Sequence, residues 1–152
     1  MTKSTSPSKG RLLESDNEIA GVVRRIRTVA VLGIKTEAQA DQPAFYVPQY
    51  AQSVGLRIFP VPVYYPEATT ILGQPVVRSV AKIGEHIDLV DVFRRPSDLM
   101  PHLPDLIEAK PDVVWLQLGI RHADFARALC DAGIDVIQDR CLMVELRQHR
   151  SS

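Results

Sequence analysis

The chain has 152 residues, enough for one domain with a substantial core, and its 45% apolar and 24% charged residues are ordinary for a globular protein. Its 18 basic and 18 acidic side chains cancel, so a nucleic-acid partner has no electrostatic support, and no apolar run is long enough to cross a bilayer. The polar N-terminus lacks the apolar segment of a secretory signal, which favours the cytoplasm, and the two cysteines lack the spacing of a metal site.

Predicted elements alternate between helix and strand along the whole chain. Residues 1–12 are too polar to form part of a core and are predicted to be a disordered tail, which leaves residues 13–152 as a single domain. The predictions that follow, in chain order, are a helix from Ser15 to Ile26, strand 28–33, helix 43–54 with Pro48 inside it, strand 56–61, loop 64–75, a short strand at 76–77, a short helix after Ser79, strand 87–93, helix 97–110, strand 112–119, helix 122–133, strand 134–139 and helix 141–149.

This alternation predicts an α/β fold with a parallel sheet covered by helices on both faces. The strands are almost entirely apolar, as expected for strands buried on both sides. In such open sheets, ligands bind beyond the carboxyl ends of the strands. The loops that follow the strands are therefore where a functional site is expected.

The motifs of common nucleotide sites are missing from these loops. Gly33 stands alone where a dinucleotide fold carries G-x-G-x-x-G, and no acid follows the second strand before Glu67. The chain also lacks a Walker phosphate loop, and its histidines are far apart in sequence. Arg94, Arg95 and Arg140 follow strand ends, where arginine can clamp phosphate. They could equally be solvated, or paired with Asp91, Asp98 or Asp139.

Three segments occur in a characteristic order: "DVFRRP" (91–96), "VWLQLGI" (114–120) and "DRCLMVE" (139–145). In order and spacing they resemble the small CoA-binding proteins, stand-alone Rossmann-like domains related to the CoA-binding domain of succinyl-CoA synthetase α subunits. The resemblance covers residues 16–149. It implies a doubly wound, five-stranded parallel sheet in a three-layer αβα sandwich that binds coenzyme A (CoA) or an acyl-CoA across the strand ends, without catalysis of its own.

The resemblance also implies which residues bind the ligand. Carried over position by position, they are Gly33, Ile34, Lys35, Thr36, Val61, Pro62, Val63, Phe93, Arg94, Arg95, Gln117, Gly119, Arg140 and Cys141. The chain departs from the family at two places. It has Val61-Pro62-Val63 where the family usually has Val-Asn-Pro, and Ile34 and Gln42 where the family usually has a small residue and an arginine.

Three other hypotheses remain open. The domain could have lost its ligand and work as an interaction or regulatory module, it could bind another nucleotide, or it could be a small enzyme acting on a CoA thioester. A homodimer is a candidate assembly for a domain of this size. Cys141 follows Arg140 and begins a helix. The helix N-terminus and the Arg140 guanidinium both favour the thiolate form of Cys141, which the thiol end of CoA could reach. The alternative is an inert, buried cysteine.

Overall fold

The computed structural model describes residues 9–150, and a five-stranded sheet lies at its centre. The strands lie in the order β2-β1-β5-β6-β7, and all neighbouring pairs run parallel. Their bounds are β1 Thr28–Leu32, β2 Arg57–Val61, β5 Leu89–Val92, β6 Val113–Leu116 and β7 Asp135–Ile137. The predicted Rossmann-like α/β fold is confirmed. The order of the strands reverses between β1 and β5, which is the switch point at which ligands bind in open α/β sheets.

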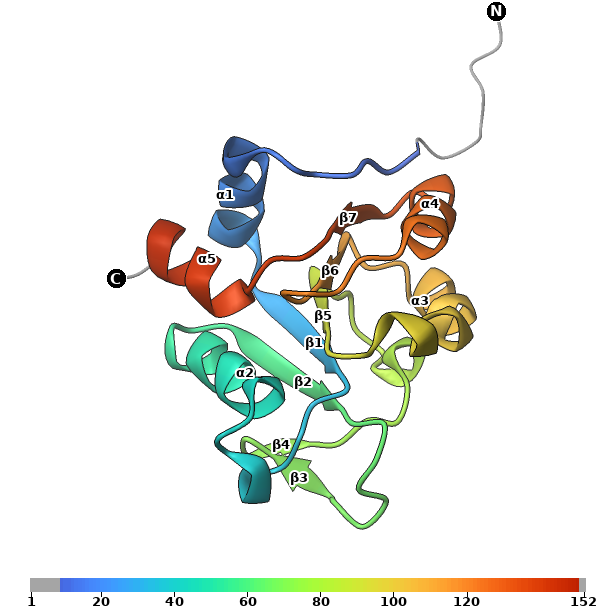
Figure 1. Cartoon of the computed structure of the whole chain (residues 1–152). Helices are drawn as coiled ribbons and strands as arrows, with labels where there is room; N and C mark the ends of the chain where they lie inside the picture. The colour runs from blue at the N-terminus through green and yellow to red at the C-terminus, as the bar shows by residue number, and fades with distance from the viewer. Residues whose placement is uncertain (1–8, 151–152) are drawn as a thin grey trace, which may run out of the picture.

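Helices cover both faces of the sheet (Figure 1). One face carries α1 (Asp16–Arg25), α2 (Pro43–Ser53) and α5 (Leu142–His149), and the other carries α3 (Leu103–Ala109) and α4 (Ala123–Asp131). The remaining elements are the single turns η1 Glu37–Gln39, η2 Val80–Lys82, η3 Pro96–Asp98 and η4 Met100–His102, and a hairpin of β3 Thr70–Ile71 and β4 Gln74–Pro75. None of the helices in residues 9–150 is both long and apolar enough to span a membrane.

Local sequence explains where α1 begins. Ser15 is the N-cap residue, and its side chain accepts a hydrogen bond from the Glu18 backbone amide. The Glu18 carboxylate reaches back to the Ser15 amide, so the two form a capping box. The apolar residues of α1, among them Val22 and Val23, are buried against the sheet. The predicted helix is confirmed.

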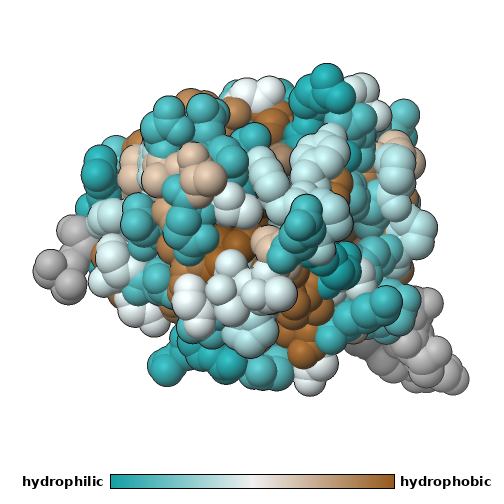
Figure 2. Space-filling view, turned by 90° about the horizontal axis from the view of Figure 1, so that it is seen from below, coloured by the Kyte–Doolittle hydropathy of each residue, from teal (hydrophilic) through white to brown (hydrophobic). Residues whose placement is uncertain are grey.

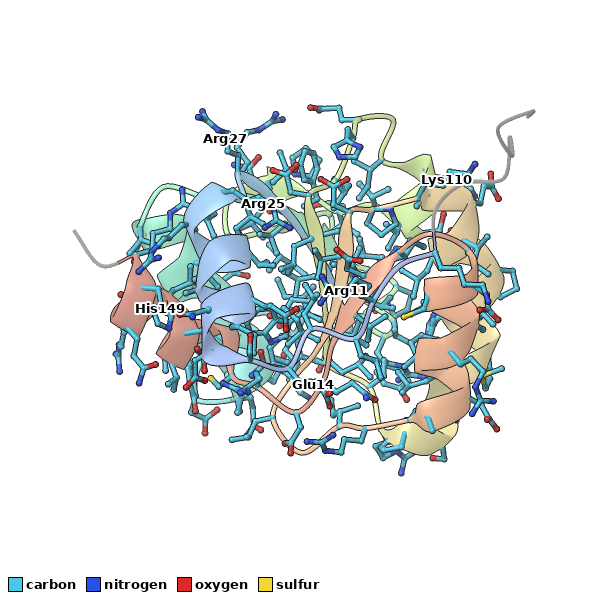
Figure 3. All side chains as sticks on the ribbon, turned by 90° about the horizontal axis from the view of Figure 1, so that it is seen from above. Arg11, Glu14, Arg25, Arg27, Lys110 and His149 are labelled. Carbon is cyan, nitrogen blue, oxygen red and sulfur yellow. The ribbon has the colours of Figure 1, made fainter. Side chains whose placement is uncertain are left out.

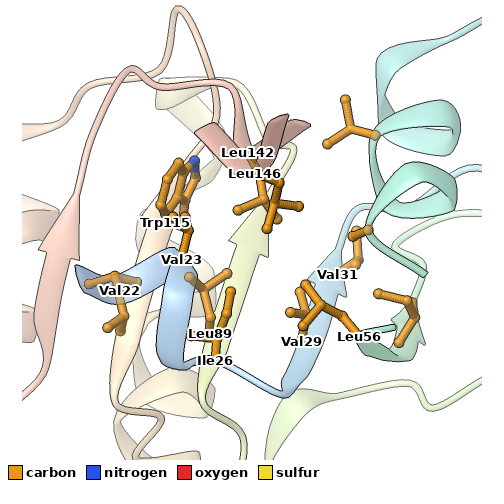
Figure 4. Packing of buried hydrophobic residues seen from close by; sticks show 14 of the residues in the cluster. Val22, Val23, Ile26, Val29, Val31, Leu56, Leu89, Trp115, Leu142 and Leu146 are labelled. Carbon is orange, nitrogen blue, oxygen red and sulfur yellow. The ribbon is translucent and has the colours of Figure 1, made fainter. Parts of the chain in front are cut away.

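Alternate residues of each strand point to opposite faces and divide the core in two. Figure 4 shows residues of the half under α1, α2 and α5, where Trp115 lies near Val23 and Val29 lies near Leu56. Because Trp115 is fully buried, its indole nitrogen needs a partner. It donates to the backbone oxygen of Arg140, 2.8 Å away, and so ties β6 to the chain segment before α5.

The prediction of a strand at 76–77 was wrong. The strands that directly precede it in the chain, β3 and β4, form a hairpin inside the segment 64–75, which was expected to be a loop. Val77 contacts the sheet through one hydrogen bond, from its amide to the Pro60 oxygen at 3.0 Å. Two β-branched residues are too short a run to distinguish a strand from an extended connection.

The N-terminal segment lies beside β7, where the sequence predicted a tail. The Gly10 amide donates to the Cys130 oxygen at 2.7 Å, and the Val136 amide donates to the Arg11 oxygen at 3.0 Å. A Cβ atom at Gly10 would come within 2.1 Å of the Ile134 oxygen, so only glycine permits this approach. Figure 3 shows the segment, with Arg11 labelled, running along the strand. Residues 1–8 of the expected tail lie outside the described residues.

Asp91 is an exception within the apolar sheet. It lies in β5, paired with Val31 on β1 and Trp115 on β6, and its side chain is fully buried. Neither carboxyl oxygen has a hydrogen-bond partner within the described residues. This burial raises the pKa of Asp91 well above its ordinary value. The pairing with a neighbouring arginine that the sequence left open for Asp91 is not formed.

The raised pKa of Asp91 has a consequence for stability. The unfolded chain releases this proton near pH 4, whereas the folded chain keeps it to higher pH, so this group lowers the free energy of unfolding as the pH rises. The effect is about 1.4 kcal/mol per pH unit within that window. Asn cannot titrate, so the stability of Asp91→Asn relative to the natural protein should rise from pH 4 upward. Urea unfolding of both proteins at several pH values measures this, and a difference independent of pH would contradict it.

Candidate functional site

A cavity of about 560 Å³ opens at the carboxyl ends of the strands, at the switch point. Strands β1 and β2 point downward in Figure 1, and Figure 2 shows the same edge from below, with apolar surface in the middle of the face and polar side chains around it. The loops after β1, β2, β5 and β6 line the cavity together with the first residues of α2 and the residue before α5. Its volume is typical of small-molecule sites.

The structure brings most of the sequence-predicted residues together in this cavity. The predicted residues that line it are Gly33, Lys35, Val63, Phe93, Arg94, Arg95, Gln117, Gly119 and Cys141. Those that do not line it are Ile34, Thr36, Val61, Pro62 and Arg140. The lining residues that sequence reasoning missed are Pro43, Ala44, Tyr46, Val47, Tyr64, Tyr65, Pro96, Leu118 and Ile120.

The predicted residues outside the cavity have other structural roles. Ile34 and Val61 are buried in the two halves of the core. Thr36 is the N-cap of η1, where its hydroxyl lies 2.8 Å from the Gln39 side-chain oxygen. Pro62 is buried directly after β2. The departure from the family at Pro62 therefore falls on a residue that does not line the cavity.

Gly33 allows the loops after β1 and β5 to approach each other. Its φ is +89°, and its amide donates to the Val61 oxygen at 2.9 Å. A Cβ atom there would lie 2.3 Å from the Phe93 oxygen, which no real side chain tolerates. Glycine is thus required both for the backbone conformation and for the contact.

A proline inside α2 holds the Lys35 loop. Pro48 has no amide hydrogen, so it cannot donate to the oxygen of Ala44 one turn earlier. That oxygen instead accepts from the Lys35 amide at 3.1 Å. The irregularity that the sequence suggested for this helix therefore anchors the β1 loop to the first turn of α2, beside the cavity.

Arg94 is the most constrained cation of the cavity. Its side chain is only 15% exposed, compared with 79% for Arg95. The Arg94 Nε atom donates to Nε2 of His102 at 3.1 Å, and its guanidinium carbon lies 5.7 Å from the centre of the Tyr64 ring. Arg95 pairs with Asp98 at 3.0 Å. Of the two arginines that the sequence indicated, Arg94 is therefore the one held at the cavity wall.

The electrostatics of the cavity favour an anion. Lys35, Arg94 and Arg95 line it, and among the residues that the structure describes no acidic side chain does so. The N-terminus of α2 also meets the cavity at Pro43 and Ala44, and the N-cap residue Gln42 provides no side-chain cap. Pro43 has no amide hydrogen and the Phe45 amide donates to the Gln42 oxygen, so among the described residues the Ala44 amide is the donor that this helix end leaves unpaired. The positive end of the helix dipole adds to its attraction for negative charge.

Gln117 provides a polar group at the other end of the cavity. It is only 5% exposed, and its side-chain oxygen accepts from the Leu142 amide at 3.0 Å. A backbone amide can only donate, so the atom facing Leu142 must be the oxygen. The Gln117 Nε2 group is left without a protein partner among residues 9–150. An amide donor that faces a cavity and has no protein partner among the described residues is suited to a carbonyl oxygen of a ligand.

The segment Asp139-Arg140-Cys141 shapes this end of the cavity. Asp139 accepts from the Gly119 amide at 2.6 Å, and this bond, with smaller contributions from Arg121 and Arg140, lowers the pKa of Asp139. Arg140 points away from the cavity and contacts Asp16, Glu145 and the Glu14 oxygen. Cys141 is the N-cap residue of α5 and lines the cavity.

Arg78 organises the loop that carries the missed tyrosines. Its guanidinium donates to the backbone oxygens of Tyr64, Tyr65 and Ala68 at 3.2, 2.8 and 3.2 Å. Tyr65 has a φ of +63°, a conformation that such external hydrogen bonds help to hold. The signal in the sequence was the pair Tyr64-Tyr65 in the loop after the predicted strand 56–61.

A second polar cluster lies at the opposite edge of the sheet. His86, Asp88 and Asp112 come before β5 and β6, and their potential metal-ligating atoms all lie within 4.8 Å of one another. One oxygen of Asp88 already accepts from the amides of Arg27 and Thr28, at 2.7 and 3.1 Å. This role is structural, because it ties the start of β1 to the start of β5.

Comparison with known proteins identifies the family. The sequence model of the family described as CoA binding domain matches residues 27–147. The chain belongs to the CoA-binding domain family. The resemblance drawn from the sequence is thereby confirmed, and the matched segment includes all cavity-lining residues.

Individual proteins and solved structures are also similar to this chain. The protein YneT of Bacillus subtilis is 32% identical over 130 residues, which are 86% of this chain and 93% of YneT. The structure named cell-free ID.343 from Thermus thermophilus is 41% identical with a TM-score of 0.81, covering 90% of this chain and 99% of that one. A hypothetical protein from Pyrococcus horikoshii is 25% identical with a TM-score of 0.80, covering 99% and 100%.

Proposed function

We propose that this protein binds CoA in the cavity at the strand ends and has no catalytic activity of its own. The observation that carries the proposal is the distribution of charge: within residues 9–150, three cationic side chains and no acidic ones line the cavity of a CoA-binding domain. Phosphates of CoA would meet Lys35, Arg94 and Arg95, together with the N-terminus of α2. The residues present therefore fit the ligand that the family implies.

The apolar walls suit the other part of the ligand. Leu118 and Ile120 line the cavity near Gln117 and Cys141. The arm of CoA that ends in the thiol contains amide carbonyls, which match the unpartnered Nε2 group of Gln117. The proposed orientation therefore places the phosphates near β1 and β5 and the thiol toward β6 and α5. An acyl group on that thiol would lie against the same apolar walls.

The absence of catalysis is inferred from the residues that line the cavity. Cys141 is a potential nucleophile, but no histidine, aspartate or glutamate of the described chain lines the cavity with it. Nucleophilic or acid–base chemistry requires such a group within hydrogen-bond reach. This favours a binding domain over an enzyme acting on CoA thioesters.

Thermal unfolding with added ligands tests the proposal. At a free CoA concentration of 100 times Kd, the folded protein should gain about 2.7 kcal/mol and its Tm should rise. Acetyl-CoA and dephospho-CoA show whether the acyl group and the 3′-phosphate matter, while NAD and ATP serve as controls. If no CoA species raises the Tm, the proposal is wrong and the interaction module becomes the better hypothesis.

The reactivity of Cys141 gives a further prediction. In the proposed orientation, its thiolate attacks one sulfur of CoA disulfide, the bond between the two CoA halves breaks, and one CoA leaves as thiolate. Intact mass should then show a single CoA adduct, mapped to Cys141 and missing in Cys141→Ser. Cys130 is the internal control, because burial and the nearby Asp135 and Asp131 raise its pKa. An adduct on Cys130, or none, would contradict the proposed position of the thiol.

A further inference from the structure

We propose that His102, in its neutral form, positions Arg94 for anion binding, and that protonation of His102 weakens the binding of phosphorylated ligands in the cavity. This inference rests on the proposed function for the identity of the ligand. His102 does not line the cavity and lies behind Arg94. It would be a positioning residue that acts on the ligand through the arginine.

The geometry assigns the protonation state of His102. Arg94 Nε lies 3.1 Å from His102 Nε2, and an arginine Nε–H can only donate. The Nε2 atom must therefore be the unprotonated nitrogen of the ring. A doubly protonated imidazolium has no acceptor, so protonation replaces this hydrogen bond with two cations facing each other.

The chain between the two residues explains why they meet. Pro96 begins the turn η3, and Pro101 lies within the turn η4, which ends at His102. These turns bring His102 back to Arg94 although eight residues separate them. The half-buried imidazole thus supports a guanidinium whose side chain is only 15% exposed.

The other contacts of Arg94 do not replace this support. Its NH1 atom lies 3.5 Å from the Tyr64 hydroxyl, and its NH2 atom lies 3.9 Å from Asp98. Both distances are at the limit of a useful polar contact. The Nε–Nε2 bond is the shortest polar contact of the guanidinium, so its loss frees the side chain to turn away from the cavity.

The charged groups around His102 come from three elements. Burial, followed by the charge of Arg94, lowers the pKa of His102, while Asp105 of α3 and Asp98 of η3 act in the opposite direction. Asp105 is already occupied, because it accepts from the Val80 and Ala81 amides at 2.8 and 3.1 Å. The neutral form of His102 is therefore favoured, and its protonation requires a lower pH than that of an ordinary histidine.

Two substitutions separate positioning from packing. His102→Gln keeps an acceptor oxygen but cannot titrate, whereas His102→Ala removes the acceptor. We expect His102→Gln to bind CoA at pH 7.5 within about 3-fold of the natural protein, and His102→Ala to bind about 10-fold more weakly, the loss of one charge-assisted hydrogen bond.

Calorimetric titration of CoA from pH 7.5 to 5 provides the decisive comparison. The 3′-phosphate of CoA also titrates in this range, but its titration affects every variant equally. The ratio of the CoA affinity of the natural protein to that of His102→Gln therefore reports only the effect of protonating His102. This ratio should fall about 10-fold for each pH unit below the pKa of His102 until the protonated form dominates binding. A constant ratio, or a ratio that rises in acid, would overturn the proposal.

A measurement without ligand keeps this inference separate from the proposed function. The imidazole of His102, followed by NMR in the free protein, should titrate at a higher pH in Arg94→Met than in the natural protein, because the facing charge is gone. An unchanged titration would overturn the coupling between the two residues. If CoA fails to bind but this shift occurs, the proposed ligand is wrong and the coupling still holds.

Discussion

Replacing Arg94 with alanine is expected to weaken CoA binding by about 10- to 100-fold, the effect of losing one or two charge-assisted hydrogen bonds to phosphate. Arg94 is held at the cavity wall, whereas Arg95 is mostly exposed and already paired with Asp98. Arg95→Ala should therefore cost less than about 5-fold, as is usual for a solvent-screened charge. Calorimetric titration measures both values.

Dephospho-CoA locates the phosphate that Arg94 contacts. If Arg94→Ala weakens CoA but not dephospho-CoA, the guanidinium binds the 3′-phosphate, and equal losses place it at the pyrophosphate. Arg127→Ala is the matched control, because it removes the same charge from an exposed position on α4, where Arg127 pairs with Asp124. If Arg94→Ala behaves like Arg127→Ala, the arginine is only a structural part of its loop.

Replacing Gly33 with alanine should destabilise the protein by about 3–5 kcal/mol, since strain at positive φ adds to a backbone overlap. The new Cβ atom would lie 2.3 Å from the Phe93 oxygen, so the loops after β1 and β5 must separate. Arg94 follows Phe93 directly, and the substitution should therefore also weaken CoA binding. Urea unfolding and CoA titration measure the two effects.

Gly55 offers the control for this substitution. It has a φ of +101°, and a Cβ atom there would meet nothing within 4 Å. Gly55→Ala should cost only the strain of positive φ, about 1–2 kcal/mol. Similar costs at the two positions would show that the β1 loop does not closely approach Phe93.

Much of the fold could be predicted from the sequence because its strands are buried on both faces. Continuous apolar runs such as Val29–Leu32 and Val113–Leu116 predict buried strands from composition alone. The segment beside β7 gave no such signal. Its position depends on backbone hydrogen bonds and on the missing side chain of Gly10, neither of which shows in hydropathy.

The site was predicted less completely, for a geometric reason. Strand-end loops could be located, but not which side chain of each loop turns toward the cavity. Ile34 and Lys35 are neighbours, yet the first is buried in the core and the second lines the cavity. His102 lay outside every loop that the sequence singled out, since it reaches Arg94 only through two short turns, η3 beginning at Pro96 and η4 containing Pro101.

The N-terminal segment beside β7, residues 10–13, also limits how two copies of this protein can associate. An exposed edge strand invites a strand from another molecule to extend the sheet. At β7 that position is taken by this chain's own residues 10–13, and at the other edge β2 contains Pro60, which has no amide to donate and whose oxygen already accepts from Val77. A second copy could extend the sheet at β7 only if residues 10–13 were displaced, and at Pro60 of β2 only if the hydrogen bond from Val77 were broken. Within residues 9–150, simple edge-to-edge extension of the five-stranded sheet is therefore a disfavoured way to build a homodimer.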